Sequence, residues 1–208
     1  AALGLDPSRK LVALLPGSRS QVAARLAPVF LRAADRLLEH DPDLALIWPR
    51  AETLAPNFPD PFLTQASLRV RKGLQVTSGL SREVLAAADV ALLASGTASV
   101  EATFLGTPQV VAYQTHPLSW FIARRLVAVP YITIANLVAG REIVPELLQA
   151  EVTAEGLADR ARPLLTDPEA RARARADLAE ARAGLGGPGA SGRVADILAE
   201  ELAGGGGR

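Results

Sequence analysis

The sequence contains no cysteine among its 208 residues. This absence excludes disulfides, thiolate metal sites and a cysteine nucleophile, and it fits a reducing compartment. The two histidines, His40 and His116, are too few for a His-rich metal site, and we expect neither a metal nor a cofactor. Aromatic residues make up only 4% of the chain and hydrophobic residues 49%, so Ala, Val and Leu must build the core.

Neither sign of charge is in excess, because Lys and Arg together number 22 and so do Asp and Glu. Because the chain has no excess of positive charge that would attract nucleic acid, we do not expect nucleic acid as a partner. The chain also lacks an apolar run of membrane-spanning length and a visible signal peptide. It contains no methionine, and the missing start methionine indicates a processed or partial sequence. Its length suffices for one domain with a real core or for two small ones.

Strand and helix patterns alternate along the first half of the chain. Short apolar runs predict strands at residues 10–15, 44–48, 90–94 and 110–113, with weaker candidates at 68–72 and 74–77. Apolar spacing and helix-compatible residues predict helices at 21–40, 82–88 and 98–105. This alternation predicts an α/β fold, a Rossmann-like and mostly parallel sheet with helices on both faces.

The pattern changes after Tyr113. We expect a helix at 116–127, a short strand at 130–134, a loop at 135–141, a short helix at 143–149, and helices at 153–165, 168–185 and 193–202. A domain boundary is placed after residue 166, so that residues 167–208 form a C-terminal helical tail. The helix at 116–127 carries Trp120 and Phe121 beside two arginines, and core packing is favoured over contact with a membrane surface.

The stretch from Asp89 to Tyr113 predicts a strand, a small-residue turn, a helix and a second strand. The turn Ser95-Gly96-Thr97 falls where a strand ends and a helix begins, and there free N–H groups and the helix dipole favour an anion. Glu101 lies one turn further on the same helix face, where a carboxylate can accept hydrogen bonds from a sugar diol. These features indicate a nucleotide site, although a helix cap explains the turn more simply when it is taken alone.

A second turn of this kind is formed by Pro16, Gly17, Ser18 and Arg19. Backbone N–H groups together with a guanidinium suit a diphosphate, whereas a solvated Arg explains the turn when it is taken alone. The sequence has neither the Walker element nor a GxGxxG fingerprint. Because this turn, residues 78–81 and the Ser95 turn all follow strands of one sheet, we favour a ligand at their shared edge.

The loop from Asn136 to Glu142 brings an amide, Arg141 and a carboxylate together among apolar residues. Two interpretations stay open from the residues alone. One is a surface loop with an Arg141–Glu142 charge pair of little energetic value. The other is that Asn136 and Arg141 complete a donor site on this scaffold.

Three segments carry a family resemblance: LLPGSRS (14–20), SREVLAAADVALLASGTASVEATFLGTPQVVAYQ (81–114) and VPYITIANLVAGREIVPELLQ (129–149). In order and spacing they closely resemble the C-terminal half of lipid-A-disaccharide synthase, a glycosyltransferase of GT-B architecture. That family transfers a diacylated glucosamine from UDP to diacylated glucosamine 1-phosphate, with inversion, at the inner membrane of Gram-negative bacteria. The resemblance therefore implies a cytoplasmic, peripherally membrane-associated enzyme of lipid A biosynthesis, with UDP-2,3-diacylglucosamine as donor and a lipid monosaccharide phosphate as acceptor.

The resemblance also implies a set of UDP-sugar-binding residues. It places Gly17, Ser18, Arg19, Ser95, Gly96 and Thr97 on the diphosphate, Glu101 on the ribose, and Gly79 with its neighbours beside the uracil. Four residues of the family's signature loop belong to the same set without individual roles: Asn136, Arg141, Glu142 and Gln149.

The sequence departs from the family in two ways. Val22 stands where the family usually has an acidic residue, which weakens the expected contacts to the sugar. The family's N-terminal half, with the acceptor site and the catalytic base, has no counterpart here. We therefore expect residues 1–166 to bind the donor, residues 167–208 to pack toward the missing half, and the chain alone to catalyse little or nothing. Three other functions stay open: another UDP-sugar transferase, half of a UDP-sugar epimerase, and a non-catalytic interaction module. A homodimer is a further open possibility for the assembly of the chain.

Overall fold

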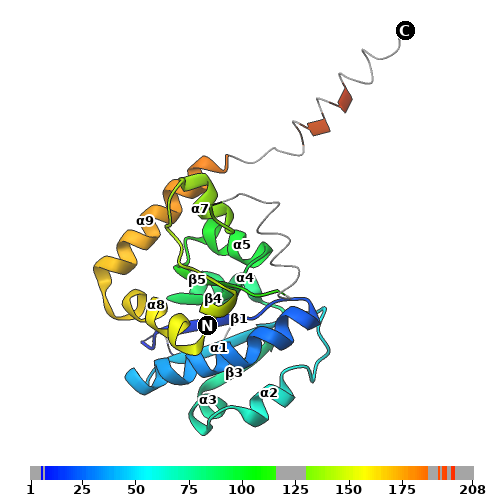
Figure 1. Ribbon diagram of the computed structural model, residues 1–208, viewed down its shortest axis with the longest axis vertical. Coiled ribbons are helices and arrows are strands. Elements are labelled where there is room, and N and C mark those ends of the chain that lie inside the picture. The colour runs from blue at the N-terminus through cyan, green and yellow to red at the C-terminus, as the bar shows by residue number, and fades with distance from the viewer. Residues whose placement is uncertain are drawn as a thin grey trace.

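A six-stranded sheet lies at the centre of the fold, and every described strand pair in it is parallel (Figure 1). The computed structural model describes residues 6, 8–115 and 130–186, with isolated positions between 192 and 199. The strand order is β3-β2-β1-β4-β5-β6. The strands are β1 (Leu11–Leu15), β2 (Ala45–Arg50), β3 (Leu74–Ser78), β4 (Val90–Ala94), β5 (Gln109–Tyr113) and β6 (Glu146–Leu148).

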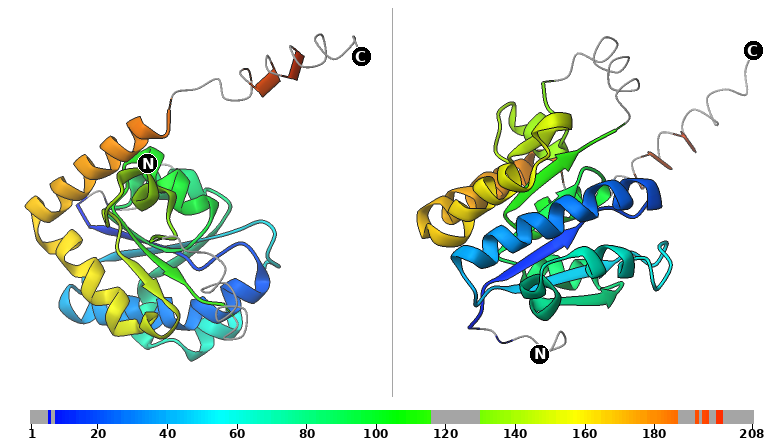
Figure 2. Two further views of the ribbon diagram at one scale, coloured as in Figure 1. Left: turned by 45° about the horizontal axis from the view of Figure 1, so that its top comes forward. Right: turned by 60° about the horizontal axis from the view of Figure 1, so that its bottom comes forward.

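Helices cover both faces of this sheet, which confirms the predicted Rossmann-like α/β fold. The helices are α1 (Ser20–His40), α2 (Asp60–Gln65), α3 (Leu68–Gly73), α4 (Ser81–Ala87), α5 (Thr97–Leu105), α7 (Ile134–Ala139), α8 (Ala154–Thr166) and α9 (Pro168–Gly184), with a 3-10 turn at η1 (Gln149–Glu151). The two buried clusters place α1, α3 and α8 on one face of the sheet and α4, α5, α7 and α9 on the other. Figure 2 shows α1 running alongside β1.

Alternating side chains of the strands feed two separate apolar cores. Val12 and Leu14 of β1 face the core that α1, α3 and α8 close, and Leu11, Ala13 and Leu15 face the core beneath α4, α5, α7 and α9. Such two-sided burial explains why β1 and β4 are apolar throughout instead of alternating with polar residues. The helical pattern of α1 likewise presents its apolar stripe, including Leu26 and Phe30, to the first core.

The sequence predictions fail in three short segments. Residues 68–72, predicted as a strand, form α3, because Ser67 Oγ accepts from Val70 N at 3.2 Å and caps a helix that buries Val70. The predicted loop at 135–141 contains α7, which Thr133 caps in the same way. The predicted helix at 143–149 is the edge strand β6, because Val111 N pairs with Pro145 O and a proline is tolerated beside an edge strand.

A fourth prediction also fails, because residues 130–133 form no strand and Ile134 begins α7. The helix predicted at 116–127 lies outside the described residues, and so does most of the helix predicted at 193–202. Within the part that the structure describes, no helix has the length and apolar character needed to cross a membrane.

Candidate functional site

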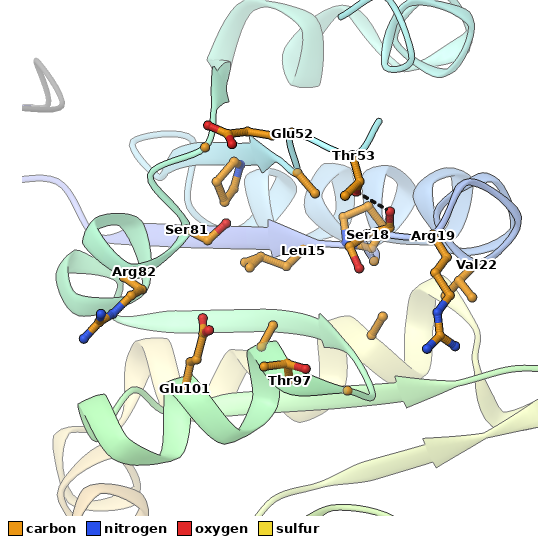
Figure 3. Close-up of a pocket in the computed structure, with 18 of the residues that line it drawn as sticks. Leu15, Ser18, Arg19, Val22, Glu52, Thr53, Ser81, Arg82, Thr97 and Glu101 are labelled. Carbon is orange, nitrogen blue, oxygen red and sulfur yellow. Dashed lines mark hydrogen bonds between the residues drawn. The ribbon is translucent and has the colours of Figure 1, made fainter. Parts of the chain in front are cut away.

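A cavity of about 590 Å³ opens at the sheet edge where the first four strands end (Figure 3). This volume lies within the roughly 300–1,000 Å³ typical of small-molecule sites. Four loops line it, one after each of the strands β1 to β4. Its lining includes Gly17, Ser18, Arg19, Val22, Ala51, Glu52, Thr53, Gly79, Leu80, Ser81, Arg82, Glu83, Ser95, Gly96, Thr97 and Glu101. The parallel sheet thus brings together residues that are far apart in sequence.

The turn after β1 depends on Gly17, whose φ of 126° favours glycine. A Cβ atom at this position would lie 3.1 Å from Val22 Cγ1, so the turn also leaves little room for a side chain. Ser18 and Arg19 follow as exposed residues immediately before α1. The N-terminus of a helix with 21 residues, with its unpaired N–H groups, therefore borders the cavity beside a guanidinium.

The turn after β4 presents a second helix N-terminus. Gly96 has a φ of 153°, and its carbonyl accepts hydrogen bonds from Ser99 N at 3.1 Å and Ser99 Oγ at 2.7 Å. Because a trans peptide places C=O and N–H on opposite sides, these bonds fix the N–H of Thr97 so that it points out of the helix. In Figure 3, Thr97 and Glu101 project from α5 into the space between α5 and β1, with Glu101 pointing toward Ser81.

The loop after β3 contains two consecutive left-handed residues. Gly79 has a φ of 66° and Leu80 a φ of 62°, which is rare for a residue with a Cβ atom. Leu80 is 44% exposed although it is apolar, and it lines the cavity. A strained backbone that displays an apolar side chain at a cavity is more common at binding sites than elsewhere.

The loop after β2 is part of the site, and the sequence analysis missed it. Glu52 and Thr53 line the cavity, and Thr53 Oγ1 donates to Ser18 O at 2.7 Å. Glu52 approaches the next loop so closely that a Cβ atom on Gly79 would lie 3.1 Å from its Oε1. The sequence could have revealed this loop, because β2 was predicted to lie in the same parallel sheet as β1. The carboxyl ends of both strands must then reach the same edge of the sheet. Arg82 and Glu83 at the start of α4 were missed as well, whereas Ser81 belongs to the predicted turn at 78–81.

The charges of the cavity are arranged along its length. In Figure 3, Glu101 and Glu52 lie toward the end that also holds Ser81, and Arg19 lies toward the opposite end with Ser18. Thr97 lies between them. One end therefore offers carboxylate acceptors together with the guanidinium of Arg82, and the other offers the guanidinium of Arg19 and the start of α1. Such an arrangement suits a ligand with hydroxyl donors at one end and an anion at the other.

Asn136 lies outside this cavity and is fully buried. Its Nδ2 donates to Val144 O and Glu146 Oε1, both at 2.8 Å. Its Oδ1 accepts from Ile143 N and Val144 N, also at 2.8 Å. Both ends of the amide are thus occupied by the chain itself, and Asn136 joins α7 to the entry of β6.

The other three residues of the signature loop also lie away from the cavity. Arg141 donates to Asp177 at 2.7 Å and to Glu180 at 3.2 Å on α9, and the hydrogen bond to Asp177 raises the pKa of Arg141. Glu142 lies 3.8 Å from Arg160 of α8. Both residues are exposed, so these contacts are screened by solvent.

Gln149 follows β6 at the same sheet edge as the cavity but does not line it. Its φ of 49° is left-handed, and its Oε1 accepts weakly from Thr115 N at 3.4 Å. Its Nε2 is buried and has no hydrogen-bond partner among the described residues. The structure therefore gathers the predicted residues from Gly17 to Glu101 around one cavity, whereas Asn136, Arg141, Glu142 and Gln149 do not line it.

The family model for lipid-A-disaccharide synthetase matches residues 1–197. The chain belongs to the lipid-A-disaccharide synthase family. It is 42% identical over 197 residues to the synthase of Anaeromyxobacter sp. (strain K), covering 94% of this chain and 50% of the relative. It is 38% identical over 202 residues to the synthase of Geobacter sulfurreducens, covering 97% and 52%. The chain thus spans about half the length of these members of the lipid-A-disaccharide synthase family.

Solved structures share the fold of this lipid-A-disaccharide synthase family member at low sequence identity. The S. aureus MnaA–UDP co-structure matches with a TM-score of 0.62 and 16% identity, over 93% of this chain and 45% of that one. Spinosyn rhamnosyltransferase SpnG complexed with thymidine diphosphate matches with a TM-score of 0.54 and 20% identity, over 85% and 42%. These likenesses identify the fold as one half of a GT-B glycosyltransferase-like architecture.

Proposed function

We propose that this chain is the donor-binding half of an inverting lipid-A-disaccharide synthase and that its cavity binds the UDP of UDP-2,3-diacylglucosamine. The observation that carries the proposal is the convergence of Arg19, Thr97 and Glu101 on one cavity. A nucleoside diphosphate needs hydrogen-bond donors around its diphosphate and a hydrogen-bond acceptor beside the diol of its ribose. The cavity offers both, toward opposite ends. Family membership and two nucleotide-bound neighbours of the same fold support this assignment.

Each end of the cavity has a separate role in the proposal. The diphosphate lies against residues 17–19 and 95–97, where two helix N-termini and Arg19 supply donors. Glu101 accepts the ribose hydroxyls. The uracil lies beside Gly79, where the exposed Leu80 side chain offers an apolar surface.

The chemical contribution of this half is stabilisation of the leaving group. As the anomeric C–O bond of the donor breaks, negative charge builds up on the UDP. Donors that are already fixed, such as the Thr97 N–H held by the Gly96–Ser99 hydrogen bonds, lower that barrier without rearranging. The neutral Val22 beside them leaves no carboxylate at that position to oppose the charge.

Catalysis requires more than the present chain. We assign the acceptor site and the catalytic base to the part of the family's length that this chain does not span. The C-terminal tail, residues 167–208, is proposed to face that part, with Leu178 and Ala181 of α9 packed into the second core of the present domain. The complete enzyme then works at the inner membrane surface of a Gram-negative bacterium. We infer that Asn136 supports the domain instead of binding UDP directly, since its amide has no free hydrogen-bonding group.

Calorimetric titration of the chain with UDP tests the proposal. Arg19→Ala should weaken UDP binding by about 10- to 100-fold, because it removes a charge-assisted hydrogen bond. The matched control is Arg32→Ala, which removes an exposed arginine of the same helix outside the cavity and should leave the affinity unchanged. If millimolar UDP does not bind to the wild type, the chain is a non-catalytic module and the proposal is wrong. Tighter binding of UDP-N-acetylglucosamine than of UDP-2,3-diacylglucosamine would indicate another UDP-sugar enzyme.

A further inference from the structure

Arg50 is a buried arginine that no motif predicted. It ends β2 and is only 7% exposed, and it is register-paired with Ser78 at the end of β3. Its Nη1 donates to Ala51 O at 3.1 Å and also to Leu54 O, and its Nη2 donates to Ser78 Oγ at 2.7 Å. All these partners are neutral, and within the described residues no carboxylate forms an ion pair with Arg50.

These bonds connect Arg50 to loops that line the cavity. Residues 51–54 contain the lining residues Glu52 and Thr53, and the guanidinium holds this loop at both of its ends. The backbone of Arg50 adds a second link to the β3 loop, because Gly79 N donates to Arg50 O at 3.0 Å. The guanidinium fork of Arg50 therefore bridges the loop after β2 and the end of β3. Along the chain these two segments are connected only through α2 and α3.

A third loop is reached through Thr53. Its Oγ1 donates to Ser18 O at 2.7 Å, within the turn that carries Arg19. The hydrogen bonds thus run from the β3 loop through Arg50 and the 51–54 loop to the β1 loop. A connected network of this kind holds its members in one arrangement more strongly than separate bonds do.

We propose that Arg50 is a positioning residue for nucleotide binding, which fixes the loops after β1, β2 and β3 in their binding arrangement before the ligand arrives. The inference rests on the proposed function of the cavity. Its physical basis is the free-energy cost of burying a guanidinium among neutral partners. We expect such a cost where the hydrogen bonds of the buried group hold loops that would otherwise be mobile. Arg50 reaches Leu54 and Ser78 with two different nitrogens of one planar group, whereas a lysine would have to reach both acceptors from a single nitrogen.

Two variants test the role of the fork. Arg50→Lys keeps the positive charge but cannot bridge the two loops, and Ser78→Ala removes one arm of the same bridge with a minimal change of shape. We expect each to weaken UDP binding, by about tenfold for Arg50→Lys, because charge-assisted hydrogen bonds are lost. Hydrogen exchange of the ligand-free protein should accelerate at residues 51–54 and 79–83 and stay unchanged in β1 and β4.

The outcomes are separable. Wild-type affinity in Arg50→Lys would mean that the charge alone matters and would overturn the inference. Faster exchange throughout the sheet, with unchanged UDP affinity of the folded protein, would mean a general structural role and would overturn it as well. If the wild type fails to bind UDP, the proposed function is wrong, whereas the exchange measurement without ligand still decides whether Arg50 holds the loops.

Discussion

Glu101 is the residue whose position distinguishes a nucleotide site from a simple phosphate site. It lies one helical turn below Thr97 and lines the same cavity. We expect Glu101→Ala to weaken UDP binding by about 10- to 100-fold, because the hydrogen bonds of ribose hydroxyls to a carboxylate are lost. Pyrophosphate binding should be unchanged or slightly stronger, because one negative charge is gone. Calorimetry with both ligands measures the difference.

A chemical control accompanies this variant. In the wild type, 2′-deoxy-UDP should bind more weakly than UDP, and in Glu101→Ala the two ligands should bind alike. Equal losses of UDP and pyrophosphate affinity in the variant would show that Glu101 does not hold the ribose.

For a substitution of Asn136 we expect the opposite result, a loss of stability without a loss of UDP affinity. Asn136→Ala leaves several buried partners of its amide unsatisfied, so we expect a loss of about 2–5 kcal/mol in the free energy of unfolding. For a domain of this size that corresponds to a melting temperature lower by roughly 4–20 °C. The UDP affinity, measured where the variant is folded, should stay close to that of the wild type.

Asn57→Ala is the control for this change, because Asn57 is exposed and only its backbone carbonyl is used in a turn. Its melting temperature should be nearly unchanged. A large loss of UDP affinity in folded Asn136→Ala would contradict the structural role and restore a direct or transmitted effect on the ligand.

At the scale of residues, the sequence predicts the turns that follow a strand and contain small or basic side chains. Gly17 and Gly96 were predictable because a positive φ and close approach both require glycine. Arg50 and Glu52 were not, because their roles depend on the register of β2 against β3 and leave no local pattern. Asn136 was ambiguous for a related reason: an amide suits a ligand and a buried turn equally well.

At the scale of elements, α8 joins α1 in closing one core, and it offers a direct test of that packing. Leu157 of α8 has no exposed surface, so Leu157→Ala should lower the free energy of unfolding by about 2–5 kcal/mol through the cavity that it creates. Leu137→Ala on α7 is the matched control, because that side chain is 42% exposed. Its effect should stay within about 0.5 kcal/mol. Chemical denaturation of both variants measures the two losses, and similar values would contradict the assigned packing.

Long elements with a strong pattern were predictable, and short ones were not. The helix at α1 and the strand at β4 follow from apolar spacing over many residues or from complete burial. The errors at α3, α7 and β6 concern segments of three to six residues, in which a cap or an edge pairing decides the outcome. Ser67 and Thr133 are such caps, and a local pattern of apolar residues does not reveal which neighbour their hydroxyl will accept from.

At the scale of the whole molecule, ligand binding and stability are linked by mass action. UDP at about 100 times its dissociation constant should stabilise the folded chain by about 2.7 kcal/mol. This should raise the melting temperature by roughly 5–11 °C for a domain of this size. A thermal-shift titration checks the prediction, with Arg19→Ala requiring proportionally more UDP for the same shift. A shift that is equal for UDP and for inorganic phosphate would contradict recognition of the nucleoside.

The cavity draws all its lining from residues 15–101 among those described, whereas β6, α8 and α9, which complete the two cores, come later in the chain. Residues of the first stretch therefore contribute both to the cavity and to the two cores, whereas those of the second contribute to the cores alone. Substitutions at the exposed lining residues of the first stretch can change what the cavity binds while the core side chains of both stretches keep the fold. Loss of folding from changes in the second stretch would, conversely, abolish binding without altering a single contact to the ligand.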